Sequence, residues 1–320
     1  MRDPDVKVSA MITAYNHERF IAEAIEGFLI QKTDFPCELV IVDDLSTDGT
    51  RDVIRRYWEK QPDRIRVLLN RHNIGAYRTL IRAHVACRGR YVAPMDGDDY
   101  WVSPDKLQRQ ADLLDDRPEC AMCFHSVTMV WDDGSREADV FRPKTIRDTY
   151  TLADLLECNF IAACSPMYRR GLFAGYPPWL FLTPVGDWAL HVLNAQYGDI
   201  GYIDEPMGVY RQHDRAMHST KDPAQKVRIA VEMFRHFLCV IPREHWGAAN
   251  RSLCRSYCRL AREYCNRGQY GQARRCMKEC LGEIRPGLSL PVRDLLNMAV
   301  QVSAPWLHRR CRRILKGGAC

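Results

Sequence analysis

The chain has 320 residues, of which 46% are hydrophobic and 27% are charged, and its formal net charge at pH 7 is +6. This length suits one large domain with an appendage. The sequence contains no run of 18 apolar residues, so we predict no transmembrane helix. Residues 1–5 leave no room for a signal peptide before the first predicted strand, so we expect none. A chain of this size with 14 cysteines is not a small disulfide-stapled scaffold, and we expect its thiols to be reduced in the cytoplasm.

The first hundred residues alternate short apolar runs with helical patterns. The apolar runs occupy 6–13, 38–42, 65–69 and 91–95, and the helical patterns occupy 18–31, 50–59 and 77–87. Strands that alternate with amphipathic helices predict right-handed βαβ units and a parallel sheet. Ligands of such sheets bind beyond the carboxyl ends of the strands.

Polar side chains follow each of the four predicted strands. They are Thr13 and Tyr15, Asp43 and Asp44, Asn70 and Asn73, and finally Asp96, Asp98 and Asp99. Because the carboxyl ends of parallel strands meet at one edge of a sheet, we expect these side chains to form a single site.

The acidic cluster after the fourth strand is the strongest chemical signal. Asp96, Asp98 and Asp99 lie within four residues, and without a cation their mutual repulsion would destabilise the fold. Carboxylate oxygens suit Mg²⁺ or Mn²⁺, which commonly bind one or two protein carboxylates plus the phosphates of a substrate. The cluster therefore indicates an enzyme that handles a nucleotide diphosphate through a metal. A solvated acidic turn is the alternative, and the bulky residues Tyr100 and Trp101 directly after the cluster argue against it.

Six short motifs follow one another along the chain. They are AYN from residue 14, VIVDDLSTDGT from 40, NIG from 73, GRYVAPMDGDDYWVSPDKL from 89, VGDW from 185 and YRQH from 210. This order resembles the family 2 glycosyltransferases with the GT-A fold, in particular enzymes that build bacterial cell-surface polysaccharides. The resemblance covers roughly 6–215. It implies an α/β catalytic domain in 1–220, Rossmann-like, with a mostly parallel sheet flanked by helices, followed by an α-helical C-terminal extension in 221–320.

The resemblance assigns the nucleotide to the first strand ends. Thr13, Tyr15 and Asp44 would contact the nucleoside base, with Asp43 close by, and Asp96 would lie near the ribose. A carboxylate can accept the N3–H of uracil, which makes uridine the first choice of base. Guanine and thymine also offer N–H donors and stay open.

The resemblance also implies a divalent metal, Mn²⁺ or Mg²⁺. Asp98 would hold it, and the adjacent Asp99 could share this task or the ribose contact of Asp96. The metal would bridge the diphosphate and neutralise charge as the sugar–phosphate bond breaks. Further along the chain, Arg211 could pair with a phosphate, and His213 could bind metal or phosphate. A purely structural histidine is the alternative at His213.

Two positions depart from the family pattern. Leu45 stands where a glycine usually follows the acidic pair, so we expect the turn there to avoid positive φ. The Ala-Arg-Asn often found after the NIG element is absent, which leaves open whether Arg78 or Arg82 contacts the donor phosphates.

The candidate catalytic base is Asp187, at the start of a helical pattern in 188–197. The resemblance places the family's catalytic carboxylate here. Direct displacement at an anomeric carbon needs one group to take the proton of the acceptor hydroxyl, and such general-base help is typically worth about 10²–10⁴ in rate. No second nucleophilic carboxylate is needed, so we expect inversion at the sugar. The alternative is that Asp187 only caps its helix, and Trp188 could stack on a sugar or lie in the core.

The charge balance changes sign near residue 251. From Arg251 onward there are 15 Lys and Arg against 4 Asp and Glu, a net charge of +11, whereas the preceding residues hold 31 against 36, a net charge of −5. This boundary favours a separate basic helical module. Its segment 253–284 predicts two amphipathic helices around a turn at 266–271, similar to a single tetratricopeptide-type hairpin. One hairpin cannot bury its own apolar face, so we expect it to pack on a helix near 223–238.

The last segment, 292–316, combines apolar residues and Trp306 with basic residues. The basic residues are Arg309, Arg310, Arg312, Arg313 and Lys316. Such a pattern favours an anionic membrane surface, to which each basic side chain contributes about 1 kcal/mol. Nucleic acid is the rival partner, and we expect none because no base-reading motif accompanies the charge.

Together these features predict a metal-dependent, inverting glycosyltransferase. It would use a nucleotide-diphosphate sugar, with a UDP-sugar as first choice, and a glycan or lipid-linked acceptor, in the cytoplasm or at the inner face of the plasma membrane. A nucleotidyltransferase would carry a Gly-rich loop with Lys or Arg after the first strand, and 14–18 lack one. A non-catalytic GT-A-like scaffold acting through its basic C-terminus would not need Asp44, Asp98 and Asp187 together.

Overall fold

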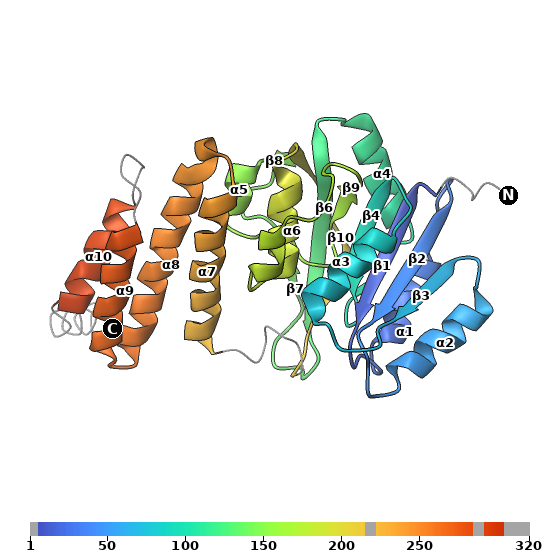
Figure 1. Ribbon diagram of the computed structural model, residues 1–320, viewed down its shortest axis with the longest axis horizontal. Coiled ribbons are helices and arrows are strands. Elements are labelled where there is room, and N and C mark those ends of the chain that lie inside the picture. The colour runs from blue at the N-terminus through green and yellow to red at the C-terminus, as the bar shows by residue number, and fades with distance from the viewer. Residues whose placement is uncertain (1–5, 215–221, 284–290, 304–320) are drawn as a thin grey trace, which may run out of the picture. The chain divides into compact units, whose positions relative to one another are not determined.

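The computed structural model of the protein describes residues 6–214, 222–283 and 291–303 (Figure 1). The chain divides into two compact units. The first comprises Met1–Leu155, Asn159–Leu182 and Gly186–Ala216, and the second comprises Leu156–Cys158, Thr183–Val185 and Met217–Cys320.

The first unit is built on one ten-stranded sheet. Its strands are β1 (Val8–Ala14), β2 (Cys37–Asp43), β3 (Ile65–Leu69), β4 (Tyr91–Asp96), β5 (Tyr100–Trp101), β6 (Cys120–Trp131), β7 (Asp139–Phe141), β8 (Thr149–Tyr150), β9 (Met167–Arg169) and β10 (Asp199–Gln212). The order across the sheet is β3-β2-β1-β4-β9-β6-β10-β5, with β7 beside β6 and β8 beside β10. The pairs within β3-β2-β1-β4 and the β6–β10 pair are parallel, whereas β9 is antiparallel to both of its neighbours. The predicted, mostly parallel sheet is confirmed.

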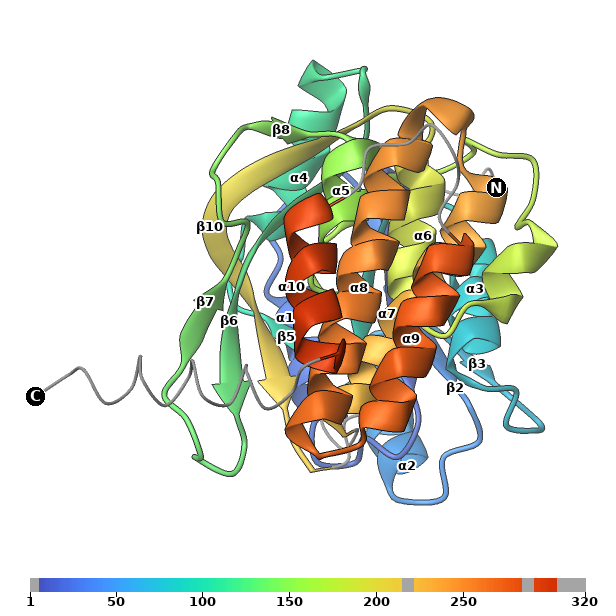
Figure 2. The same ribbon diagram turned by 90° about the vertical axis from the view of Figure 1, so that its left-hand side faces the viewer.

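Helices cover both faces of this sheet, as Figures 1 and 2 show. They are α1 (Ile21–Leu29), α2 (Thr50–Lys60), α3 (Ala76–Ala86), α4 (Lys106–Asp116), α5 (Leu152–Glu157) and α6 (Gly186–Ala195), with a short 3-10 turn η1 (Pro178–Leu182) before α6. Alternation along β1 separates the two cores: Ile12 packs in a cluster with α1, α2 and α4, while Met11 packs in a second cluster with α3. Each fully buried aliphatic side chain of this kind stabilises the fold by about 1.5–3 kcal/mol.

Strand β10 runs from Asp199 to Gln212 although Pro206 lies within it, and proline disfavours a central strand. The structure accommodates Pro206 at an irregularity in the β6–β10 ladder, where the register shifts on both sides of it. Strand β10 thereby continues to Gln212, and Arg211 lies at its end.

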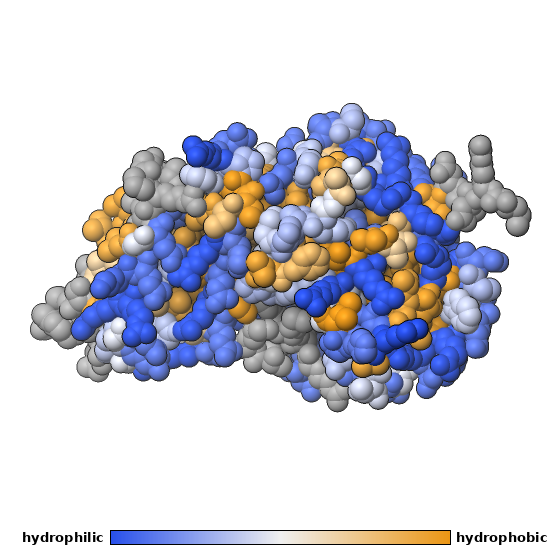
Figure 3. All heavy atoms as spheres, in the orientation of Figure 1, coloured by the Kyte–Doolittle hydropathy of each residue, from blue (hydrophilic) through white to orange (hydrophobic). Residues whose placement is uncertain are grey.

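The second unit is helical. Its helices are α7 (Pro223–Val240), α8 (Trp246–Asn266), α9 (Tyr270–Glu283) and α10 (Val292–Ser303), with a 3-10 turn η2 (Arg243–His245) before α8. Helices α8 and α9 form a hairpin, which turns at Gly268 with φ +75°, and α8 packs on α7. Figure 3 shows apolar atoms at the surface of the part that α9 and α10 occupy, where Leu281, Val292 and Leu296 are each more than half exposed.

No helix in the described part of the chain combines the length and the hydropathy that a membrane crossing requires. The basic cluster of 309–316 and Trp306 lie outside the described residues.

Candidate active site

The register of the sheet brings three polar strand ends level. Thr13 of β1 lies opposite Asp96 of β4, and Ala14 lies opposite Asp43 of β2. The Thr13 hydroxyl donates a hydrogen bond of 2.7 Å to Asp96 Oδ1. Tyr15 follows at the same edge and is 46% exposed. The candidates from the first, second and fourth strands thus lie at one edge of the sheet.

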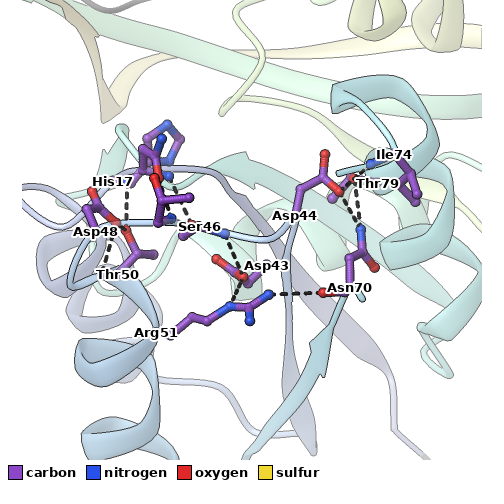
Figure 4. A network of polar contacts seen from close by, with 12 residues as sticks. His17, Asp43, Asp44, Ser46, Asp48, Thr50, Arg51, Asn70, Ile74 and Thr79 are labelled. Carbon is purple, nitrogen blue, oxygen red and sulfur yellow. Dashed lines mark hydrogen bonds and ion pairs between the residues drawn. The ribbon is translucent and has the colours of Figure 1, made fainter. Parts of the chain in front are cut away.

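Asp44 is held by three hydrogen bonds (Figure 4). Its Oδ1 accepts from Asn70 Nδ2 at 2.7 Å and from the N–H of Ile74 at 2.8 Å, and its Oδ2 accepts from the N–H of Gly75 at 2.9 Å. The side chain is buried, and Gly75 has a φ of +86° that a glycine adopts without strain. This carboxylate therefore fixes the loop before α3 as well as lying at the predicted nucleotide position.

Asp43 is neutralised by a neighbouring cation. Its side chain is fully buried, and its Oδ1 accepts hydrogen bonds from Arg51 Nε and from the N–H of Ser46. Asp43 Oδ2 has no hydrogen-bond partner among the residues that the structure describes. Arg51 was not predicted for this place, and its only signal in the sequence is its position in the first turn of α2.

The prediction for Leu45 was wrong. Leu45 has a φ of +64°, in the left-handed region that costs a non-glycine residue about 1–2 kcal/mol. The bonds on both sides fix this turn: the N–H of Asp44 donates to the carbonyl of Ala14, and Ser46 donates to Asp43. The strain is therefore offset by contacts that no local pattern at position 45 reveals.

The acidic loop between β4 and β5, residues 96–99, is short of compensating charge. Burial, reinforced by the charge of Asp98, raises the pKa of Asp96 to about 7 and that of Asp99 well above its usual value. The pKa of Asp98 is lowered even though burial acts to raise it, because His213 hydrogen-bonds to it and His17 adds positive charge. The negative charge of the loop is therefore only partly offset by the positive groups around it.

The side chains around Asp98 include two imidazoles that can ligate a divalent metal beside the carboxylate. Asp98 Oδ2 lies 3.1 Å from His213 Nε2 and 3.9 Å from His17 Nε2. Gly97 allows this approach, because a Cβ there would lie 2.7 Å from His17 Nδ1. No three metal-ligating side chains among the described residues converge on a common point. The residues fit a metal that takes most of its ligands from a bound diphosphate. His17, directly after the AYN motif, was not predicted for this place.

Arg211 and Arg82 both have protein partners. Arg211 contacts the acidic loop and Glu23, and Arg82 donates to Asn70 Oδ1. Arg78 is exposed. Trp188 is buried, which favours the core alternative for its ring over the sugar-stacking alternative.

Asp187 lies in the first turn of α6 and is half-buried. Its Oδ1 accepts the N–H of Trp188 at 2.8 Å, as expected of a residue at a helix start. Burial raises the pKa of Tyr77 to about 12, and the negative charge of Asp187 is the second cause of this shift. The charge of Asp187 also contributes to the raised pKa of Asp96. A Cβ on Gly186 would overlap the ring of Tyr77, so the glycine lets α3 and α6 approach closely. The fold thus places Asp187 within electrostatic range of the acidic loop.

Comparisons with known proteins bear on the family and the fold of the chain. The model of glycosyl transferase family 2 matches residues 9–176. An uncharacterized protein of Mycobacterium tuberculosis is 39% identical over 206 residues, which are 64% of this chain and 59% of that protein. The putative teichuronic acid biosynthesis glycosyltransferase TuaG of Bacillus subtilis is 38% identical over 164 residues, which are 51% of this chain and 62% of that protein. The chain therefore spans less than two thirds of the length of these curated relatives.

Solved structures share the fold. TarS of S. aureus in complex with UDP-GlcNAc superposes with a TM-score of 0.63 at 18% identity, over 88% of this chain and 82% of that chain. The mannosyltransferase PcManGT of Pyrobaculum calidifontis, in complex with GDP-Man and Mn²⁺, gives a TM-score of 0.54 at 20% identity, over 95% and 84%. These neighbours confirm the predicted GT-A fold. Since the family model covers more than half of the chain, the chain belongs to glycosyl transferase family 2.

Proposed function

We propose that this chain transfers a sugar from a nucleotide-diphosphate donor to a hydroxyl of a glycan or lipid-linked acceptor, with inversion and with a divalent metal. The observation that carries the proposal is the acidic loop. Asp96 and Asp99 have raised pKa values because three carboxylates lie together in a buried place. A cation that arrives with a diphosphate would relieve this repulsion.

Asp98 and His213 would hold the metal, with Asp99 and His17 beside them. When bound, the metal supplies Lewis-acid stabilisation of the charge that develops on the leaving diphosphate. Asp187 takes the proton of the acceptor hydroxyl as its oxygen bonds to the anomeric carbon. The electron pair of the sugar–phosphate bond leaves with the nucleoside diphosphate. One displacement by one oxygen inverts the sugar.

The donor is most simply a UDP-sugar. TarS was solved with UDP-GlcNAc, and the Escherichia coli relative WfaP, 36% identical over 108 residues, is named as a UDP-Glc-dependent β-1,3-glucosyltransferase acting on a diphosphoundecaprenol-linked sugar. PcManGT was solved with GDP-Man, so guanosine stays the second choice. Tyr15, which is nearly half exposed, would stack on the base, and Thr13 and Asp44 would contact it.

The basic helical unit is proposed to bind an anionic membrane surface. The net charge of +11 from residue 251 onward and the exposed Leu281, Val292 and Leu296 support this. Flotation with vesicles of phosphatidylglycerol and with vesicles of phosphatidylcholine tests it. Binding to the anionic vesicles alone is expected, and it should weaken on removal of 292–320. Equal flotation of the full and shortened chains would contradict the proposal.

The first test of the catalytic proposal is thermal stabilisation by UDP, GDP, ADP and dTDP, each with and without Mn²⁺. A ligand at about 100 times its Kd adds about 2.7 kcal/mol to the free energy of unfolding. We expect one nucleotide to stabilise the protein more than the other three, and we expect Mn²⁺ to increase that stabilisation strongly. No stabilisation by any of the four would instead favour a non-catalytic scaffold.

Asp187→Asn separates catalysis from binding. It should keep the Mn²⁺-dependent stabilisation and lower transfer by about 10²–10⁴, because only the proton acceptor is lost. Asp199→Asn, a half-buried aspartate at the start of β10, is the matched control and should keep both properties. Full activity of the Asp187 variant would remove it from the mechanism.

A further inference from the structure

We propose that Arg211 is a positioning residue that holds the acidic loop in place for the metal, instead of a ligand of the donor phosphates. The inference rests on the proposed function, because it concerns the same metal and diphosphate. Several protein groups already contact this one side chain.

The guanidinium of Arg211 bridges the acidic loop and helix α1. Its Nε donates to the carbonyl of Asp98 at 3.0 Å, and its Nη2 donates to Glu23 Oε2 at 2.6 Å. Its central carbon lies 4.7 Å from the ring centroid of Phe20 and 5.1 Å from that of Tyr100. The side chain is therefore fixed in position by two hydrogen bonds and two aromatic rings, which suits the planar shape of a guanidinium.

The backbone of the same residue adds a third contact to the loop. The N–H of Arg211 donates to Asp99 Oδ1 at 2.9 Å. Two residues later, His213 Nε2 lies 3.1 Å from Asp98 Oδ2, and its ring lies 4.8 Å from that of Phe20. The end of β10 thus holds the main chain of Asp98 through Arg211 and its carboxylate through His213.

These contacts leave Arg211 poorly placed for a phosphate. Its side chain is only 10% exposed, and its charge is already balanced by Glu23, with Asp132 Oδ1 at 3.9 Å from Nη1. A phosphate would have to displace Glu23 and draw the guanidinium out from between Phe20 and Tyr100. A positioning role needs no such rearrangement.

Loss of this support should act on the metal step. A displacement of about 1 Å in a catalytic group can lower the rate by about 10²-fold, and loss of a residue that orients a metal ligand typically costs about 10–100-fold in metal affinity or activity. We therefore expect Arg211→Met to lower kcat by about 10–100-fold and to raise the Mn²⁺ concentration for half-maximal activity. The affinity for the nucleoside diphosphate without metal should stay within about twofold.

The partner of the bridge gives an independent test. Glu23 is half exposed, and Glu23→Gln removes its charge without touching the loop. It should shift kcat and the Mn²⁺ requirement in the same direction as Arg211→Met, but by less. In the Arg211→Met background the same change should have no further effect, because the two residues act through one contact.

Arg19→Met is the matched control. Arg19 lies over the same ring, 5.0 Å from the Phe20 centroid, but its side chain is 60% exposed and pairs with Asp132 instead of the loop. Its replacement should leave kcat and the Mn²⁺ requirement unchanged. Arg211→Lys keeps the charge and should recover part of the activity, and it carries the test if Arg211→Met does not fold, as judged by circular dichroism.

The decisive measurement is nucleotide affinity by calorimetry, for UDP and UMP, with and without Mn²⁺, in the wild type and in each variant. Suppose that Arg211→Met weakens metal-free UDP binding by about tenfold and leaves UMP binding unchanged, and that this loss does not depend on Glu23→Gln. Arg211 is then a phosphate ligand, and the inference fails while the proposed function stands. If the wild-type protein binds none of the candidate nucleoside diphosphates with Mn²⁺, the proposed function fails, and the inference fails with it.

Discussion

Two pairs of adjacent aspartates follow two strands of the same sheet, and they are treated differently. Asp43 and Asp44 have Arg51, the Asn70 side chain and three backbone N–H groups as protein partners. Asp98 and Asp99, together with Asp96, remain a site where burial and mutual charge raise two of the three pKa values. Protein groups offset the charge of the first pair, whereas the second is the pair for which we propose a cation from outside. An identical dipeptide can therefore be compensated by the protein in one loop and only partly compensated in another.

Asp98→Asn should have the largest effect, since it removes the carboxylate that we assign to the metal. A metal ion contributes several kcal/mol to such a transition state, so transfer should fall by about 10³-fold. The stabilisation by Mn²⁺ with the nucleotide should disappear in a thermal melt. Asp112→Asn, an exposed position on α4, is the control. Unchanged Mn²⁺ dependence in Asp98→Asn would place the metal elsewhere.

Arg51→Met should have the next largest effect, this time on stability. It leaves Asp43, which is fully buried, without its cation, and loss of one partner of a buried pair costs about 3–5 kcal/mol. Arg51 is partly exposed, so we expect about 2–3 kcal/mol from urea unfolding. Arg55→Met, one turn later on α2 and 61% exposed, should change the free energy of unfolding by less than about 0.5 kcal/mol. Equal losses in the two variants would show that Asp43 does not depend on Arg51.

The acidic loop should also give the metal-free protein a distinctive pH dependence. Asp96 has a folded-state pKa of about 7, so between about pH 4 and pH 7 the folded state keeps a proton that the unfolded state has lost. Its contribution to stability is therefore present at low pH and is lost as the pH rises through this window. Asp96→Asn removes this contribution, while the other titrating groups remain.

The measurement is the free energy of unfolding of both proteins between pH 4.5 and pH 7.5, without metal. The difference between wild type and Asp96→Asn should fall as the pH rises. A difference that is constant or that rises would mean that Asp96 is ionised throughout, as a solvated acidic turn would be.

Leu45→Gly should have the smallest effect and the opposite sign. Glycine adopts a φ of +64° without the penalty of about 1–2 kcal/mol that leucine bears, although its unfolded state gains entropy. We expect a net gain of up to about 1 kcal/mol in the free energy of unfolding. Leu45→Ala keeps the Cβ and should show no gain. A loss of stability in the glycine variant would mean that the leucine side chain contributes more than its strain costs.

The four parallel strands β1 to β4 could largely be predicted from sequence, because buried parallel strands appear as continuous apolar runs. The predicted 65–69 matches β3, and the predicted 91–95 is one residue shorter than β4. The rest depends on contacts between distant segments. The turn at Leu45 is fixed by Ala14, and Arg211 meets Glu23 from 188 residues away. No local pattern encodes such pairings, and for the same reason the role of Arg211 could be judged only from the structure.

The close approach of Gly186 to Tyr77 bears on how the binding of one substrate would affect the binding of the other. Helix α3 begins at Ala76, directly after Gly75, whose N–H is bonded to Asp44 at the nucleotide position. The Tyr77 ring on that helix lies against the first turn of α6, one residue before the candidate base. A nucleotide that shifts α3 would therefore also shift Asp187, the candidate catalytic base. Donor and acceptor would then bind cooperatively, and each would change the affinity of the other by the same factor.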